Sequence, residues 1–245
     1  QEKFVKYLRK KFNNNLDAMN HEFGLDYWSN RIDRWQDFPP VENTINASLA
    51  CAFSRYQRQQ VTEYLAWQAA IVREYAQPHQ FVTHNFDFEW RGYSYGVQPR
   101  VDHFAAAQAL DIAGVDIYHP SQAHLTGREI AFGGAITRSL KPGQNYFVLE
   151  TQAQGFAQWT PFPGQLRLQA FSHIASGAAM VSYWHWHSIH NAFETYWKGL
   201  LSHDFSRNPT WQEATTIGAD FARLSPQLAE LKAENDVALL ISNEA

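Results

Sequence analysis

Apolar side chains recur at a helical period in several parts of the chain. In the segment 54–74, Tyr64, Trp67 and Ile71 follow one another at spacings of three and four residues, which places them on one face of a helix. A basic segment at the start of the chain is amphipathic in the same way. The segments with a helical pattern are 2–13, 54–74, 102–112, 163–175 and 210–234, and 127–138 is predicted as either a helix or irregular structure.

Shorter apolar runs, of the length of a strand, lie between and after these segments. They occupy 81–86, 115–119, 146–150, 178–186 and 237–242. Apart from the last run, four strands alternate with four helical segments, which is typical of βαβ units in a parallel sheet covered by helices. A closed barrel needs eight such units in roughly 250 residues, so the pattern fits a small doubly wound sheet or the second half of a barrel whose first half is absent.

The glycines argue against a nucleotide-binding form of the doubly wound sheet. Neither GxGxxG nor GxxxxGK[ST] occurs in the chain. Gly133-Gly134 is an isolated pair, for which we expect a turn. The aromatic-rich stretch Asp26–Pro40 ends in two prolines and is expected to be a loop.

The composition is that of a globular protein of 245 residues with 20 basic and 24 acidic side chains and a net charge of −4. This mild balance indicates no nucleic-acid partner and no membrane surface, which require a concentrated basic face or a polybasic segment. The apolar runs are far shorter than the roughly 20 residues that cross a bilayer. The single cysteine, Cys51, permits no internal disulfide, so we expect a reducing, cytoplasmic location. Gln1 in place of methionine indicates a processed, trimmed or partial chain.

Polar side chains follow each of the four alternating strands at its carboxyl end. This edge of the sheet carries the functional residues of α/β barrels, and periodicity alone does not require polar residues there. The four groups are Thr83-His84-Asn85, Asp116-Ile117-Tyr118-His119-Pro120, Glu150-Thr151-Gln152 and Tyr183-Trp184-His185-Trp186-His187.

Glu150 is the most informative of these residues because it follows the apolar run Phe147-Val148-Leu149. A carboxylate at the point where a buried strand emerges must be solvated, paired or functional, since burial of an unpaired charge is costly. The residues alone leave two interpretations open, a salt bridge at the strand end or a reactive group.

Three histidines, His185, His187 and His190, raise the question of a metal site. His185 and His187 alternate as on a strand, so they can face one side. A metal needs three or more convergent ligands, and neither an HExxH motif nor a cysteine partner accompanies these rings. We therefore predict no metal and expect the rings to line a pocket or to be hydrogen-bonded. The absence of GxSxG also argues against a serine hydrolase.

Six stretches of the chain carry a family resemblance. They are FGLDYWSNRIDRWQDFPP (23–40), VTHNF (82–86), AGVDIYHP (113–120), LETQ (149–152), Trp159 with PGQLRL (163–168), and FETYWKGLLSHD (193–204). Together they resemble the β-galactosidases of glycoside hydrolase family 42. They lie in the family's order and cover nearly the whole chain, and the combination is more specific than any one stretch.

The resemblance implies a fold and an assembly. The family folds as a (β/α)₈ barrel followed by a trimerisation domain and a small β domain. The fold class implied is therefore α/β, and residues 1–234 are expected to form the C-terminal half of the TIM barrel, strands 5–8 with their helices. Residues 235–245 are expected to begin the following domain, and the full-length protein is expected to be a homotrimer without a cofactor.

The resemblance also implies roles for residues at matching positions. Family members are retaining enzymes that remove terminal β-D-galactosyl residues by double displacement, so β-galactosides or galacto-oligosaccharides are the expected substrates. Glu150 occupies the position of the nucleophile, and Glu194 that of a carboxylate that binds sugar hydroxyls. Trp197 stands where many members have a histidine. The other expected substrate-binding residues are Trp159, Asn85, Tyr118, Asp116 and Trp28.

The nucleophile of a retaining enzyme must stay ionised, so hydrogen-bond donors are expected around Glu150. Asn85, Tyr118 and His119 are the candidates for these donors.

The second catalytic carboxyl group of the family has no counterpart in the chain. In the family, the acid/base glutamate lies in an Asn-Glu pair at the end of the fourth barrel strand, and Asn243-Glu244 lies in the wrong region. The acid/base is therefore expected to precede Gln1, and the isolated 245-residue chain is expected to be inactive. Two alternatives remain, a carbohydrate-binding barrel without catalysis and a related barrel glycosidase such as an α-L-arabinopyranosidase.

Overall fold

The computed structural model describes residues 1–88, 100–119, 126–155, 160–195 and 197–242. This part of the chain contains seven α-helices, two one-turn 3₁₀ helices and four strands. It divides into two compact units, of which unit 1 is formed mainly by Gln1–Tyr64 and unit 2 mainly by Leu65–Gln98 and His103–Ile241.

Unit 1 is helical. Its elements are α1 (Glu2–Lys11), α2 (Leu16–Glu22), the 3₁₀ turns Tyr27–Ser29 and Trp35–Asp37, and the first part of α3 (Ala47–Tyr75). The predicted helices 2–13 and 54–74 are thus confirmed, although α3 begins earlier than its apolar pattern does. The short helix α2 was not predicted. Its start carries a local signal, because the side chain of Asn15 accepts a hydrogen bond from the N–H of Ala18 as an N-cap.

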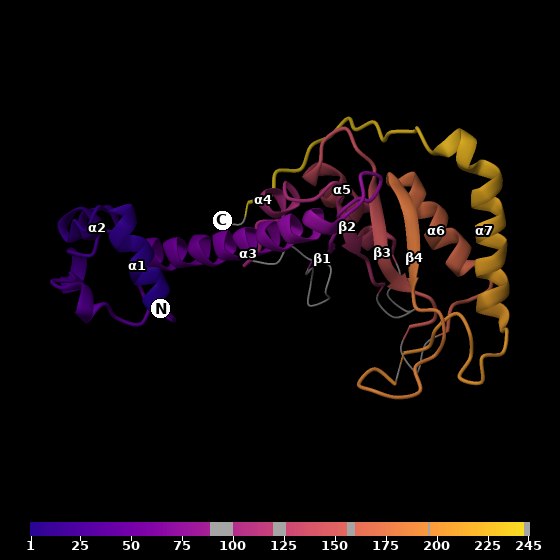
Figure 1. The fold of residues 1–245 in the computed structure, drawn as a ribbon, viewed down its shortest axis with the longest axis horizontal. Coiled ribbons are helices and arrows are strands. Elements are labelled where there is room, and N and C mark those ends of the chain that lie inside the picture. The colour runs from indigo at the N-terminus through magenta and orange to yellow at the C-terminus, as the bar shows by residue number, and fades with distance from the viewer. Residues whose placement is uncertain (89–99, 120–125, 156–159, 196, 243–245) are drawn as a thin grey trace. The chain divides into compact units, whose positions relative to one another are not determined.

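Unit 2 contains a parallel sheet of four strands in the order β1-β2-β3-β4 (Figure 1). The strands are β1 (Asn85–Asp87), β2 (Gly114–Asp116), β3 (Tyr146–Gln152) and β4 (Ala178–Trp184). Successive strands are neighbours and all pairs are parallel, which confirms the predicted α/β architecture. The helices of unit 2, in addition to the end of α3, are α4 (His103–Ala107), α5 (Arg128–Leu140), α6 (Gln165–Ala175) and α7 (Pro209–Leu228).

Several predicted bounds were wrong. The strand predicted at 81–86 occupies only Asn85–Asp87, and the helix predicted at 102–112 shortens to α4. The apolar run 237–242 forms no strand, and Val237, Leu239 and Leu240 are exposed. A strand is stable only when its backbone pairs with another strand, and among the described residues none pairs with this run.

The largest hydrophobic core of unit 2 lies between the sheet and its helices. Val115, Ile117, Tyr146 and Val148 are fully buried, and they alternate along β2, β3 and the continuation of β2. A smaller cluster joins α6 to α7 through Leu166, Ala170 and Ile217. Apolar packing against the helices therefore holds the sheet in place. The polar residues at the strand ends lie outside this core and are available to form a site.

The pair Gly133-Gly134 lies inside α5, so the predicted turn was wrong. A β-carbon on Gly133 would lie 2.9 Å from Cδ1 of Ile117, and one on Gly134 would lie 3.0 Å from Cβ of Ser176 and closer still to the hydroxyl of Tyr146. The two glycines therefore allow α5 to approach the sheet more closely than any helix with side chains at these positions.

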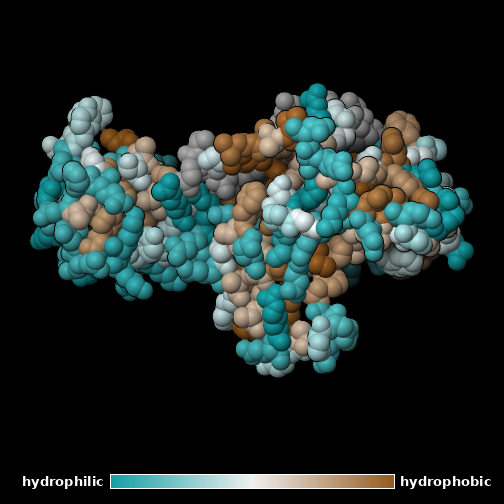
Figure 2. All heavy atoms as spheres, turned by 90° about the horizontal axis from the view of Figure 1, so that it is seen from above, coloured by the Kyte–Doolittle hydropathy of each residue, from teal (hydrophilic) through white to brown (hydrophobic). Residues whose placement is uncertain are grey.

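The outer surface mixes polar and apolar residues. On the face drawn in Figure 2, polar residues predominate and apolar residues form separate patches among them. Helix α3 exposes Tyr64, Trp67, Ile71 and Tyr75, which share one helical face. None of the described helices combines the length and the hydropathy needed to span a bilayer.

We predict opposite effects for two helical glycine substitutions. Gly134→Ala should lower the free energy of unfolding by about 1–3 kcal/mol, because the buried ring of Tyr146 has no room to move away. A β-carbon at Gly218 in α7 would meet no atom within 4 Å. Gly218→Ala should therefore raise the free energy of unfolding by up to about 1 kcal/mol. Urea unfolding measures both, and equal stability of the two variants would contradict the close packing of α5.

Candidate active site

Side chains from β1, from the end of β2 and its continuation, and from β3 bring together four of the predicted site residues, Asn85, Asp116, Tyr118 and Glu150. Asn85 begins β1, Asp116 ends β2, and Glu150 lies near the end of β3. Asp116 pairs with Glu150 in the ladder, and the register between β2 and β3 shifts just before this pair, between Val115 and Asp116. Such an irregularity changes the direction of side chains, here at the edge where the polar residues lie.

Both carboxylate oxygens of Glu150 accept a hydrogen bond. The hydroxyl of Tyr118 donates to Oε2 at 2.7 Å, and Nδ2 of Asn85 donates to Oε1 at 3.3 Å. The same Nδ2 lies 2.8 Å from Oδ2 of Asp116. Donors of this kind favour the ionised form of a carboxyl group. Asn85 and Tyr118 are therefore donors to Glu150, as expected from the sequence.

Asp116 is buried beside this group. Burial raises its pKa to about 7, the negative charges of Glu150 and Asp87 act in the same direction, and the hydrogen bond from Asn85 opposes them. Its Oδ1 is buried without a hydrogen-bond partner among the described residues. Asp116 is thus the carboxyl group at this edge that most readily holds a proton near neutral pH.

Tyr118 remains a proton donor at all ordinary pH values. Burial raises its pKa, as do the hydrogen bond to Glu150 and the charges of Glu150, Asp116 and Glu194. The charge of Glu194, from the loop that follows β4, thus acts on the same hydroxyl. The ring of Trp197 from that loop lies 5.4 Å from the ring of Tyr118. The structure therefore groups Asn85, Asp116, Tyr118, Glu150, Glu194 and Trp197.

His119 is not a donor to Glu150, so that expectation was wrong. Its Nδ1 lies 3.0 Å from Oε1 of Glu129 at the start of α5, and both side chains are buried. Its backbone is bound by the side chain of Gln152. The sequence analysis placed Gln152 at the end of its strand but gave it no role, and it did not consider Glu129. The available signal was that Gln152 follows Glu150 by two residues and so shares its face of the strand.

For two predicted residues, a place in this group is not tested. Trp159 lies outside the described residues. Trp28 belongs to unit 1, where its ring is 74% exposed and stacks on Tyr27 at 5.2 Å. Its expected role in sugar binding stays a prediction.

The histidines after β4 form an aromatic cluster. The rings of His185, His187 and His190 follow one another at 5.7 Å, and Phe205 packs on His187 at 4.9 Å. Burial, with His187 nearby, lowers the pKa of His185. Within the described ranges, no set of three or more His, Cys, Asp or Glu side chains is placed to hold a metal.

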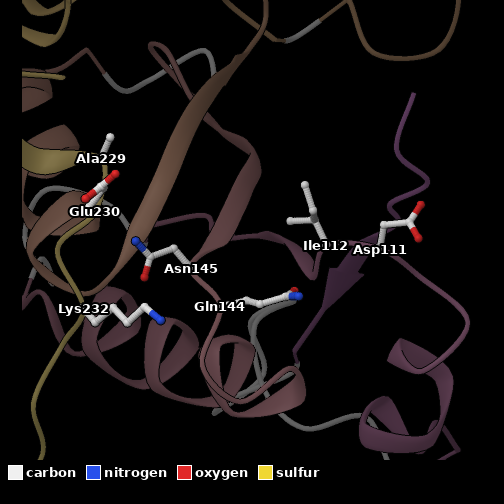
Figure 3. Close-up of a pocket in the computed structure, with 7 residues that line it drawn as sticks. All are labelled: Asp111, Ile112, Gln144, Asn145, Ala229, Glu230 and Lys232. Carbon is white, nitrogen blue, oxygen red and sulfur yellow. The ribbon is translucent and has the colours of Figure 1, made fainter. Parts of the chain in front are cut away.

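A pocket of about 540 Å³ lies at the opposite end of the strands from Glu150 (Figure 3). Asp111 and Ile112 precede β2, Gln144 and Asn145 precede β3, and Glu230 and Lys232 follow α7. The close-up shows Asn145, Glu230 and Lys232 on one side of the pocket and Asp111 on the other. The amino ends of barrel strands contribute to stability and not to chemistry, so the candidate site is the other edge.

A parallel α/β sheet that gathers its polar side chains at the carboxyl edge defines the chain as part of an α/β barrel. A family model described as β-galactosidase, that of glycoside hydrolase family 42, matches residues 1–224. The chain therefore belongs to this family.

Individual relatives agree with the family assignment. The chain is 26% identical to β-galactosidase BgaA of Clostridium cellulovorans and 29% identical to β-galactosidase BgaA of a Thermus species. These matches cover 99% and 100% of the chain but only 37% and 39% of the relatives. A catalytic mutant of Gan42B, a family 42 β-galactosidase from G. stearothermophilus, has the same fold, with a TM-score of 0.87 at 23% identity over 100% of this chain and 37% of that one.

We predict a characteristic pH dependence for Asp116→Asn. The folded protein keeps the proton of Asp116 up to about pH 7, whereas the unfolded chain loses it near pH 4, so the wild type loses stability as pH rises between these values. The variant lacks this loss. The difference in free energy of unfolding between the variant and the wild type should therefore shift in favour of the variant, by on the order of a few kcal/mol, as the pH rises from 4 to 8.

The control is Asp111→Asn, which should behave in the opposite way. The N–H of Val82 and the guanidinium of Arg73 hold the pKa of Asp111 below its usual range, so its stabilising effect exists above that range and is lost in acid. Urea unfolding at several pH values measures both variants. A parallel pH dependence of Asp116→Asn and the wild type would contradict the buried, protonated carboxyl group.

Proposed function

We propose that the parent protein of this chain hydrolyses terminal, non-reducing β-galactosyl residues with retention of configuration, and that Glu150 is its nucleophile. The observation that carries the proposal is the pair of hydrogen bonds from Tyr118 and Asn85 to the two oxygens of Glu150. These two donors fix the orientation of the carboxyl group of Glu150 at the edge where barrel enzymes carry their chemistry. Membership of the β-galactosidase family supports the substrate class.

The reaction consists of two displacements at the anomeric carbon. Glu150 attacks this carbon and forms a galactosyl-enzyme while an acid protonates the leaving oxygen, and water then releases the sugar with the same group acting as a base. The two carboxyl groups of retaining enzymes lie about 5–5.5 Å apart on either side of the bond. Asp116 is an unsuitable acid because it is buried and its Oδ2 already accepts a hydrogen bond from Asn85.

We therefore propose that the acid/base glutamate is supplied by a part of the parent outside this chain. The chain spans 37% and 39% of two curated relatives, which leaves room for the rest of a barrel. We assign the four strands to positions 5–8 of the barrel, residues 1–234 to its second half, and 235–245 to the beginning of a trimerisation-type domain. A homotrimer is the expected assembly, and these finer assignments rest on the sequence resemblance.

The galactosyl ring is proposed to lie between Glu150 and the loop after β4. Glu194 accepts hydrogen bonds from sugar hydroxyls, and Trp197 with Trp159 offers aromatic faces to the C–H groups of the ring. An epimer would leave a buried acceptor unpaired, and this is how such a site discriminates between sugars. The indole of Trp197 replaces the histidine of many family members, so polar contacts at that position are reduced.

Glu150→Ala in the full-length parent should reduce hydrolysis of an aryl β-galactoside by about 10³-fold or more, since no covalent intermediate can form. Added azide should restore turnover and yield the α-galactosyl azide, because it enters from the face that the carboxylate has vacated. The control is Glu63→Ala, which removes a surface carboxylate on α3. Near-normal turnover of Glu150→Ala would remove Glu150 from the mechanism.

The isolated 245-residue chain should show no galactosidase activity and should aggregate. Helix α3 exposes several large apolar side chains, and β1 and β4 are the outer strands of the sheet in the described part of this chain. An assay beside the full-length parent, with the aggregation state followed by light scattering, checks this prediction. A monodisperse and active preparation of the chain alone would refute it.

A further inference from the structure

The side chain of Gln152 connects the last residue of β3 to the chain that leaves β2. Its Oε1 accepts the N–H of His119 at 2.8 Å, and its Nε2 donates to the carbonyl oxygen of His119, also at 2.8 Å. Gln152 and His119 are both buried. A carboxamide has one acceptor and one donor side, so it substitutes here for a peptide group of a neighbouring strand.

This clamp lies one residue from Tyr118. On the other side of Tyr118, the N–H of Ile117 donates to the carbonyl oxygen of Glu150 at 2.9 Å. Tyr118 is therefore preceded and followed by residues tied to β3, the strand that carries Glu150. Its hydroxyl then lies 2.7 Å from Oε2 of Glu150.

The imidazole of His119 makes contacts of its own, one of them to α5. Its Nδ1 meets Glu129, and its Nε2 lies 3.4 Å from Oγ1 of Thr151. Burial would raise the pKa of Glu129, but the hydrogen bonds from His119 and from backbone N–H groups hold it below its usual range. Glu129 is thus an ionised acceptor, and His119 is bound through its backbone and its ring.

We propose that Gln152 is a positioning residue for the nucleophile, and that it acts by holding the backbone beside Tyr118 so that the phenol stays on Glu150. The inference rests on the proposed function. The carboxamide also satisfies the buried N–H and carbonyl oxygen of His119, so its removal lowers stability, and the proposal concerns the additional effect on the position of Tyr118.

The effect should appear in turnover and not in sugar binding. The phenol aligns Glu150 for its attack, and it stabilises the negative charge that returns to Glu150 when the galactosyl-enzyme breaks down. Loss of the clamp lets Tyr118 move away from this position. The sugar is held by other groups, so KM should change little while kcat falls.

The test is a double-mutant cycle in the full-length parent. Gln152→Glu replaces the donor side by an oxygen that repels the carbonyl of His119, and Gln152→Met keeps the volume but removes both hydrogen bonds. Each is combined with Tyr118→Phe, and kcat and KM are measured per folded, titrated active site. We expect about a tenfold to hundredfold fall in kcat with KM within about twofold, and less than about a twofold further fall in the Tyr118→Phe background.

A matched control exists in unit 1. The carboxamide of Asn20 clamps the backbone of Ile32 in the same way, with hydrogen bonds of 2.8 and 3.0 Å. Asn20→Asp should lower stability toward urea as Gln152→Glu does. It should leave kcat per folded molecule unchanged in both backgrounds.

Three outcomes would overturn the proposal. These are an equal fall in kcat with and without the Tyr118 hydroxyl, a loss of activity that only follows the unfolded fraction as in Asn20→Asp, or failure of both Gln152 variants to fold, which would make the clamp a requirement of the fold alone. Glu150→Ala is measured in parallel. Retained hydrolysis in that variant would instead refute the proposed function, whatever the cycle gives.

Discussion

A single amide group, that of Asn85, lies between two carboxyl groups, and the polar edge of the sheet depends on it. Its Nδ2 reaches both Asp116 and Glu150, so two like charges are brought to one donor. Repulsion is relieved when one of them keeps its proton, and the deeper burial of Asp116 selects that residue. Glu150 accepts a second hydrogen bond, from the phenol of Tyr118. The difference in environment thus separates two chemically similar groups.

The close packing of α5 supports this arrangement from behind. Gly133 and Gly134 let the helix approach Ile117 and Tyr146, and the start of the same helix then brings Glu129 to His119. His119 in turn is bound to Gln152, next to the donor of Glu150. A series of short contacts therefore runs from the core side of the sheet to its polar edge. Some of these residues therefore contribute both to the stability of the fold and to the geometry of the site.

The sequence predicted features that depend on local residue patterns. It predicted less well those features that depend on contacts between residues distant in the chain. The alternation of strands and helices predicted the parallel sheet, and polar residues after apolar runs predicted the grouping of Asn85, Asp116, Tyr118 and Glu150. The glycine pair was misjudged because its role depends on the ring of Tyr146, which only the fold brings near. His119 was misassigned for the same reason, since Glu129 and Gln152 offer it better partners than Glu150 does. The run 237–242 has the composition of a strand, but composition cannot supply a pairing partner.

The contact between Tyr118 and Trp197 extends the argument from position to environment. The indole packs on the phenol that binds Glu150, with the ring centres 5.4 Å apart, and gives this phenol an apolar neighbour. A hydrogen bond beside an apolar ring, in a part-buried position such as this one, is stronger than the same bond in water. A histidine at this position would bring polar atoms and ordered water closer to the phenol. We infer that, with tryptophan at this position, the orientation of Glu150 depends more strongly on Tyr118. It then also depends on the residues that hold the backbone of Tyr118.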